Sequence, residues 1–314
     1  MSRRSTCCSL GLLLVSSLLA TPSLAQHGSP ASAGPSSVLT PASLKADLVV
    51  LRDSFVNREA SYTPDARRQA VLRTGALIAA SDTLRRAWLE LEVARIAALA
   101  DNGHTGSFAP LRAMHFNRVP FRLVPLGDDF YVLAVQPDMR DLLGARLTSI
   151  DGHPIAAVRA IAHTLSGGTP AWRDRSAPYF FESPELMHAL GTTGAADSAT
   201  YGFTMPNGRQ VSRRVRGLPA DPNSPFIPAS VWMSPSPITL GVQTWTTLLD
   251  ESRAPWSVRD PHARFRWRDA PEVDGVVIEL RQNVDAGNAH PDIPRQRDAC
   301  WSSAGRAMSC WTCA

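Results

Sequence analysis

Lysine and cysteine are both scarce in this chain, and each scarcity limits the chemistry that the sequence allows. Lys45 is the only lysine among 32 basic residues, so a reaction that needs a lysine base must use Lys45 or do without. Of the five cysteines, Cys7 and Cys8 lie near the N-terminus and the other three lie in the last fifteen residues. The body of the chain therefore has no disulfide framework.

Long apolar runs are also absent. No stretch reaches the roughly 20 apolar residues that a membrane-spanning helix needs, and the longest one, near the N-terminus, is shorter. Apolar residues nevertheless make up 44% of the 314 residues and charged residues 19%, which excludes a wholly disordered chain. A chain of this length is expected to form about two or three domains.

The N-terminus has the pattern of a secretory signal over residues 1–25. Arg3 and Arg4 supply positive charge, residues 10–20 are apolar and small, and Ser-Leu-Ala at 23–25 is a small-x-small cleavage site. The alternative is a buried first helix. The signal predicts a periplasmic or secreted protein, without a stable membrane anchor once the signal is removed. Removal lowers the net charge from +4 to +2 and leaves no dense basic stripe, so no nucleic-acid partner is expected.

Helical patterns dominate the first part of the mature chain. Residues 26–39 are rich in Ser, Pro, Gly and Ala, which is typical of a flexible leader. Thr40-Pro41 and Thr63-Pro64 are helix starts, each with a threonine cap followed by proline. From about residue 82 to residue 100, apolar side chains recur at helical spacing. These three segments predict a helical bundle over residues 40–106.

The apolar period changes to that of strands in residues 107–217. Apolar residues dominate at 121–125 and 130–135, and Asn207-Gly208 is a strong hairpin pattern. A helix is expected from about residue 155 to residue 165, and another after Ser183-Pro184. The segment therefore predicts a β module that also carries short helices.

The rest of the chain divides into three parts. Residues 218–237 form a connector rich in proline and serine. Strands are predicted at 238–245 and 273–280, and Val-Val-Ile in the second suits a strand buried on both faces. Residues 238–294 are assigned to an incomplete α/β core, and residues 295–314, with three cysteines and two tryptophans, to an atypical tail. The predicted fold class is therefore α+β multidomain: a bundle, a β module and the start of an α/β core.

Three short segments carry a family resemblance. The first is Asp-Asn-Gly-His-Thr-Gly at 101–106, where the predicted bundle ends. The second is Leu-Leu-Gly-Ala-Arg-Leu at 142–147, continued by Ile-Asp-Gly-His-Pro-Ile at 150–155. The third is Val-Val-Ile-Glu-Leu-Arg-Gln-Asn at 276–283. In this order they resemble the S41 family of serine peptidases, the C-terminal-processing and tricorn-like group, whose β module is PDZ-like and whose catalytic core is α/β.

The resemblance implies that His104 is the general base for a serine nucleophile, as in the tricorn-like branch. A neutral imidazole accepts a hydroxyl proton near neutral pH, so the role is chemically sound. The plain alternative is a histidine that caps the loop after a helix. The other branch of the family uses a serine–lysine dyad, and Lys45 lies far from any such motif.

The resemblance also implies a peptide-binding loop in the PDZ-like module. Backbone N–H groups of Leu142, Leu143 and Gly144 would bind a peptide's C-terminal carboxylate, while the peptide adds a strand to the sheet edge. Arg146, or Arg140, would add positive charge. The alternative is an ordinary turn with the arginine in solvent. The partners expected on this ground are peptide or protein C-termini.

Two parts of the family's catalytic machinery depart from its pattern here. In place of a glycine pair for the oxyanion hole, the chain has Val-Asp-Ala-Gly at 284–287, so Gly287 is the one candidate left. Ser303 is the candidate nucleophile, but it comes early and no apolar strand precedes it. The abrupt change of composition after Arg295 is what a frameshift or a misplaced stop would produce.

These observations predict an exported S41-type serine peptidase that cleaves peptides near their C-termini. The chain as it stands is expected to lack its nucleophile and to be inactive. The alternatives are a non-catalytic protein that binds peptide C-termini, and a degenerate fragment without function. No cofactor and no metal is expected, because the histidines stand singly and Cys310-x-x-Cys313 has no second ligand pair.

Overall fold

The computed structural model describes residues 40–222, 227, 229–236, 238–240, 243–263 and 265–280. The predicted signal, leader and tail, together with Gly287 and Ser303, lie outside the described residues. By its internal contacts the chain divides into two units, Met1–Thr40 and Pro41–Ala314, and every element below belongs to the second. Among the described residues, no helix is both long enough and apolar enough to cross a bilayer.

Helices form where the Thr-Pro pairs and the apolar period predict them. They are α1 (Pro41–Val50), continued by the π-helix η1 (Leu51–Val56), α2 (Pro64–Ala79) and α3 (Arg86–Ala98). Thr63 caps α2, because its side chain accepts a hydrogen bond from the Ala66 N–H (3.2 Å). The Tyr62 hydroxyl donates to the Ile96 carbonyl (2.8 Å) and so joins the loop before α2 to α3. Apolar side chains from all four share one buried cluster, while Leu91 and Ala94 of α3 pack in the larger cluster with residues of the sheet.

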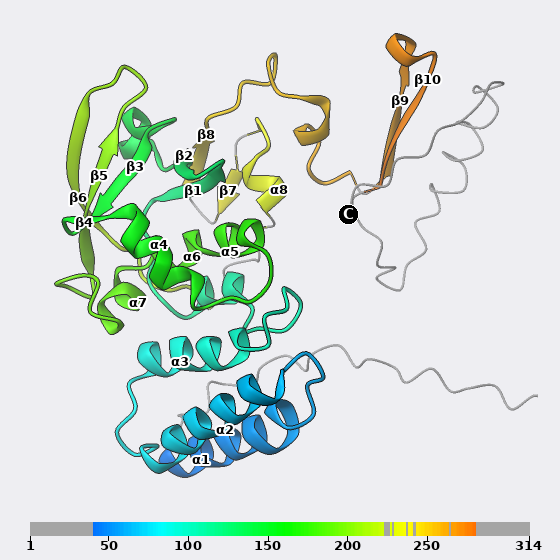
Figure 1. Ribbon diagram of the computed structural model, residues 1–314. Coiled ribbons are helices and arrows are strands. Elements are labelled where there is room, and N and C mark those ends of the chain that lie inside the picture. Colours follow the sequence, from blue (N-terminus) through cyan, green and yellow to red (C-terminus); the bar gives the residue numbers. More distant parts are fainter. Residues whose placement is uncertain are drawn as a thin grey trace, which may run out of the picture. The chain divides into compact units, whose positions relative to one another are not determined.

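An antiparallel sheet comes after the bundle in the chain (Figure 1). Its strand order is β6-β5-β3-β2-β8-β7, with β1 also paired to β2 and β4 to β3. The strands are β1 (Phe121–Leu126), β2 (Asp129–Val135), β3 (Arg146–Ile150), β4 (His153–Pro154), β5 (Ser198–Thr204), β6 (Gln210–Arg216), β7 (Ile238–Leu240) and β8 (Gln243–Thr247). The predicted Asn207-Gly208 hairpin forms between β5 and β6, with Gly208 at φ +83°.

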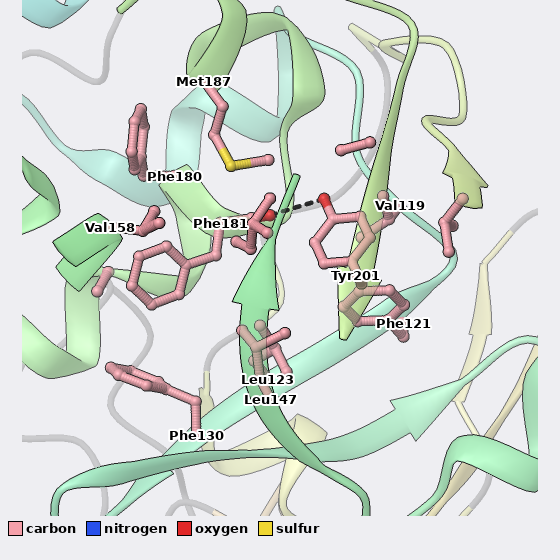
Figure 2. Packing of buried hydrophobic residues seen from close by; sticks show 14 of the residues in the cluster. Val119, Phe121, Leu123, Phe130, Leu147, Val158, Phe180, Phe181, Met187 and Tyr201 are labelled. Carbon is pink, nitrogen blue, oxygen red and sulfur yellow. Dashed lines mark hydrogen bonds between the residues drawn. The ribbon is translucent and has the colours of Figure 1, made fainter. Parts of the chain in front are cut away.

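Buried aromatic side chains and four short helices build the core against this sheet (Figure 2). The helices are α4 (Ile155–His163), α5 (Pro170–Ser176), α6 (Pro178–Phe181) and α7 (Pro184–Ala189), and 3-10 turns lie at Ala109–Met114, Pro137–Leu142 and Trp256–Val258. The ring of Phe181 meets that of Phe130 edge to face, with centroids 4.9 Å apart. The Phe181 carbonyl accepts a hydrogen bond from the buried Tyr201 hydroxyl (2.8 Å), so that hydroxyl is satisfied within the core.

The strands β7 and β8 belong to this same sheet, which differs from the predicted division of the chain. β8 pairs with β2 through Ala134–Thr247 and Val135–Thr246, and with β7 along its other edge. The sequence predicts a separate α/β core over residues 238–294. An apolar period identifies a strand but does not say which sheet it joins, because pairing depends on residues far away in the chain.

A second, two-stranded antiparallel sheet consists of β9 (Phe265–Ala270) and β10 (Gly275–Leu280). The short helix η5 (Pro271–Val273) and Asp274, at φ +48°, form the turn between the two strands. The sequence predicts a strand buried on both faces here, whereas most β10 side chains are half-buried. A hairpin of two strands leaves both of its faces partly open, which accounts for the difference.

One carboxylate is completely removed from solvent. Glu182, directly after α6, has no exposed surface. Its Oε2 pairs with Arg118 Nη2 (2.6 Å) and Arg122 Nη1 (3.4 Å), and its Oε1 accepts a hydrogen bond from the Leu123 N–H (2.7 Å). The charge of Glu182 is therefore balanced inside the protein, by two guanidinium groups and one strand N–H.

Arg122 connects this carboxylate to the part of the sheet formed by β7 and β8. Its guanidinium lies 4.3 Å from the ring centroid of Trp245 and 5.2 Å from that of Trp232, which is in α8 (Ala229–Trp232). Burial, with the like charge of Arg118, lowers the pKa of Arg122 to about 9, and Glu182 opposes that shift. The guanidinium therefore stays charged at neutral pH.

We predict that Glu182→Gln lowers the free energy of unfolding by about 3–5 kcal/mol, because it leaves two buried cations without their counter-charge. The matched control is Asp141→Asn. Asp141 pairs with Arg213 at a distance of 2.6 Å, but its side chain is 51% exposed. The free energy of unfolding of that variant should fall by less than about 1 kcal/mol. Urea unfolding followed by tryptophan fluorescence measures both, and equal losses would contradict the prediction.

Candidate functional site

His104 lies in an exposed loop between α3 and the first 3-10 turn. Its backbone N–H donates to Asn102 Oδ1 (2.9 Å), which closes a tight turn within the loop. Its imidazole stacks on the indole of Trp172 from α5, with ring centroids 6.2 Å apart and planes inclined by 28°. The imidazole is thus supported on one side by an aromatic ring and is otherwise open to solvent.

Hydrogen bonds hold this loop from two directions. Asn102 Nδ2 donates to Ser61 Oγ (2.9 Å) in the loop before α2. On the other side, Asp101 Oδ1 accepts from the Gly168 N–H (3.1 Å) and from Arg173 Nη2 (2.6 Å). The bundle and the segment that joins α4 to α5 therefore fix the backbone next to His104 together.

Two glycines allow the chain to approach this loop closely. A Cβ on Gly167 would lie 2.7 Å from the Asn102 nitrogen, and one on Gly168 would lie 2.9 Å from Gly103 Cα. Gly168 also has φ +91°, a backbone angle that residues other than glycine rarely adopt. The sequence indicates this glycine pair only as a helix stop, because close packing against a distant loop leaves no local pattern.

The catalytic partners predicted for His104 are not among the described residues. Ser303 and the oxyanion candidate Gly287 both lie outside them. Within the described ranges, the imidazole of His104 forms no hydrogen bond with a hydroxyl or a carboxylate. His104, which the resemblance implies as a general base, thus has no nucleophile beside it among the described residues.

The turn predicted to bind a peptide carboxylate already uses its N–H groups. The N–H of Leu143 donates to the Arg140 carbonyl (3.2 Å) and that of Gly144 to the Val132 carbonyl (2.9 Å). The N–H of Ala145 donates to the Leu142 carbonyl (2.9 Å). A carboxylate could bind these groups only if it replaced bonds within the turn and the bond that joins Gly144 to β2. Gly144 in this turn has φ +76°, a backbone conformation that favours glycine.

The strand after this turn has partners along both edges. β3 pairs with β5 on one side, and with β2 and β4 on the other. Arg146, the predicted source of positive charge, pairs with Asp129 (3.2 Å). A peptide could not add to β3 without displacing one of these strands.

A cluster of charged side chains that no sequence pattern predicts joins α4 to α5. Asp174 is 6% exposed and binds Arg159 through both oxygens (2.7 and 2.5 Å), and His163 Nε2 lies 2.7 Å from its Oδ1. Burial opposes ionisation of Asp174, but the hydrogen bonds from Arg159 and His163 outweigh it and lower its pKa. Eleven residues separate His163 from Asp174, and only the packing of two helices brings them together.

A hollow of ≈ 560 Å³ lies where the turn between β3 and β4 meets the loop before β5. It is lined by Asp151, Gly152, His153, Gly191, Thr192, Thr193, Gly194 and Thr200. The Asp151 carboxylate accepts from the N–H groups of Gly194 (2.9 Å) and Thr200 (2.6 Å), so it braces these loops. Among the described residues, no group of three histidine, cysteine, aspartate or glutamate side chains lies close enough to hold a metal ion.

No family model matches the chain, and no curated protein matches it either. Among solved structures it is similar to CPAF, a chlamydial serine protease. A point mutant of CPAF matches with a TM-score of 0.36 and 16% identity, over 57% of this chain and 34% of that one. Mature CPAF complexed with lactacystin matches with a TM-score of 0.37 and 16% identity, over 57% and 35%. The chain spans about a third of these CPAF chains, and a likeness this weak carries no argument about its activity.

The close approach at Gly168 leads to a testable prediction. Gly168→Ala should destabilise the protein by about 1–3 kcal/mol more than Gly127→Ala, because only the first adds a collision to the cost of a positive φ. Gly127 has φ +62° and no neighbouring atom within 4 Å of an added Cβ. Chemical unfolding measures the difference, and equal losses in the two variants would show that the approach at Gly168 is unimportant.

The cluster at Asp174 gives a pH-dependent prediction. Asp174→Asn should lower the free energy of unfolding by about 3 kcal/mol at pH 7, since it leaves the half-buried Arg159 without its carboxylate partner. A carboxyl group with a lowered pKa in the folded state stabilises the protein above its ordinary pKa, and this contribution is lost as the pH falls. The difference in free energy of unfolding between wild type and variant should therefore become smaller below about pH 4. Asp128→Asn, at the exposed carboxylate 3.5 Å from Arg159, is the control and should change little.

Proposed function

We propose that this chain is an exported peptide-binding protein of the S41 serine-peptidase type, with His104 in the place of the general base. The observation that carries the proposal is an open imidazole on a loop that Ser61 holds from one side and Gly168 from the other. A base that serves a bound substrate needs both a free approach and a fixed backbone. The loop of His104 provides these two conditions.

Binding without turnover is favoured over cleavage near peptide C-termini, which is the activity that the resemblance implies. Acyl transfer by a serine requires its hydroxyl to lie within hydrogen-bond reach of the base. In the part of the chain that is described, no hydroxyl takes that position beside His104. Ser303 as nucleophile and Gly287 in an oxyanion loop remain proposals that rest on the resemblance.

Recognition by this protein should not depend on the terminal carboxylate of a peptide. The N–H groups of Leu143 and Gly144 are bonded within the turn, and the positive charge of Arg146 is paired with Asp129. Peptides are therefore expected to bind through their backbone and side chains. Export to the periplasm or the exterior, after loss of the predicted signal, is part of this proposal and rests on the N-terminal sequence alone.

The test uses one labelled peptide set in free-acid and amidated forms. We expect peptides to bind the full chain with the same dissociation constant in both forms, as measured by fluorescence anisotropy. We also expect no steady release of fragments when the mixtures are followed by liquid chromatography, because no hydroxyl among the described residues forms a hydrogen bond with the His104 imidazole.

Each part of the proposal has an outcome that would contradict it. Loss of binding on amidation would return the carboxylate site to Leu142–Gly144. Steady turnover that disappears in both His104→Ala and Ser303→Ala, but persists in the exposed control His115→Ala, would show a working peptidase. If no peptide binds at all, the protein is not a peptide-binding protein.

A further inference from the structure

The strand β6 forms one end of the sheet. It pairs with β5 over its whole length, from Ser198–Arg216 to Thr204–Gln210, without a bulge. In the ranges that the structure describes, no strand pairs with its other side. The outer edge of β6 therefore presents a row of backbone groups that a further strand would satisfy.

Two hydrogen bonds show which backbone groups point outward. The N–H of Met205 donates to the Arg209 carbonyl, and that of Gly217 donates to the Asp197 carbonyl, both at 2.8 Å. These two bonds lie at opposite ends of the β5–β6 ladder, and hydrogen-bonded pairs alternate along an antiparallel ladder. The residues that bond to β5 are thus Val211, Arg213 and Val215. The residues whose N–H and carbonyl groups face outward are Gln210, Ser212, Arg214 and Arg216.

The side chains of these outward-bonding residues are also exposed. All four of them, at 210, 212, 214 and 216, lie in solvent, while Val215 on the opposite face is buried in the core. A peptide that adds to a sheet as a strand uses both kinds of group. Hydrogen bonds to the backbone provide affinity, and contacts with the exposed side chains provide specificity.

The edge carries more positive than negative charge. Its four arginines are Arg209, Arg213, Arg214 and Arg216. Two carboxylates face them: Asp141 lies 2.6 Å from Arg213, and Asp197 lies 2.8 Å from Arg216. Arg214 Nη2 donates to the neutral Ser198 Oγ (2.9 Å), so the charge of Arg214 has no carboxylate in this contact. A partner that lies along β6 should therefore be acidic.

We propose that the outer edge of β6 binds an extended acidic peptide, which adds to the sheet as a further strand. A second copy of the same edge would bring like charges together, so it is the less suitable occupant. A nucleic acid would match the charge, but its phosphodiester backbone has no donors for the outward carbonyls of Ser212 and Arg214. The inference rests on the proposed function only in that the partner is a peptide, and it requires no reaction at His104.

The test compares two labelled peptides, an alternating Glu–Val octapeptide and the matching Lys–Val octapeptide, on the full chain. We expect the acidic peptide alone to bind, and its affinity to fall as salt is added. Ser212→Pro removes an outward N–H and no bond to β5, so binding should weaken by about fivefold or more. The control Ser212→Ala keeps this N–H and should bind as the wild type does.

A second pair of variants tests the charge without touching the backbone. Arg214→Gln should weaken binding of the acidic peptide, whereas Arg58→Gln, at an exposed arginine after η1, should not. Circular dichroism melting curves establish that each variant is folded.

Several outcomes would overturn the proposal. They are equal binding of both octapeptides, unchanged binding in Ser212→Pro, and slow hydrogen exchange of the outward amides in the free chain, which would mean that another segment already covers them. Scattering data that show a dimer lost in Ser212→Pro would assign the edge to a second copy. If peptides bind but β6 variants have no effect, this inference fails and the proposed function stands; if no peptide binds, both fail.

Discussion

The buried carboxylate of Glu182 is the constraint on which the sheet and its helices depend. A charge without access to water is tolerated only where hydrogen bonds and opposite charges replace hydration. Here Arg118, Arg122 and the Leu123 N–H replace it, and together they tie β1 and the residues just before it to the end of α6. Because Arg122 also lies against Trp245, the position of β8 is coupled to the same carboxylate. The geometry of the whole sheet is thus linked to one side chain that no catalytic argument would have selected.

Occupied edges decide where a peptide can bind on this fold. The resemblance implies that a peptide binds at the turn Leu142–Gly144 and along β3. The N–H groups of this turn, however, already form hydrogen bonds within the protein, and β3 has strands on both sides. Strand addition needs unpaired backbone groups, so it moves to an outer strand. The alternation of hydrogen bonds in β6 then selects Ser212 and Arg214 among the residues of that strand. The proposed binding site follows from which backbone groups remain available, rather than from which residues resemble a motif.

Local patterns in the sequence predict local structure well, because their cause lies within a few residues. Thr63 caps α2 with its own hydroxyl, and the Asn207-Gly208 hairpin forms because Gly208 readily adopts the positive φ that the turn requires. Contacts between distant segments have no such pattern. The pairing of β8 with β2, and the approach of His163 to Asp174, depend on how whole elements pack. For the same reason, the sequence locates His104 at the end of the bundle but cannot say what faces its ring.

The near absence of lysine has a structural counterpart in how the protein uses arginine. Arg173 donates from three different nitrogens, to Gly168, His163 and Asp101, and so ties the loop of His104 to α4 and α5. A lysine at this position would offer one nitrogen and could not span these three acceptors. Arg122 likewise uses its flat face against tryptophan and its edge against backbone carbonyls. A cation that is buried, or that joins several segments at once, needs several donors in one planar group. The guanidinium of arginine meets both demands, and Arg122 and Arg173 occupy such positions in this chain.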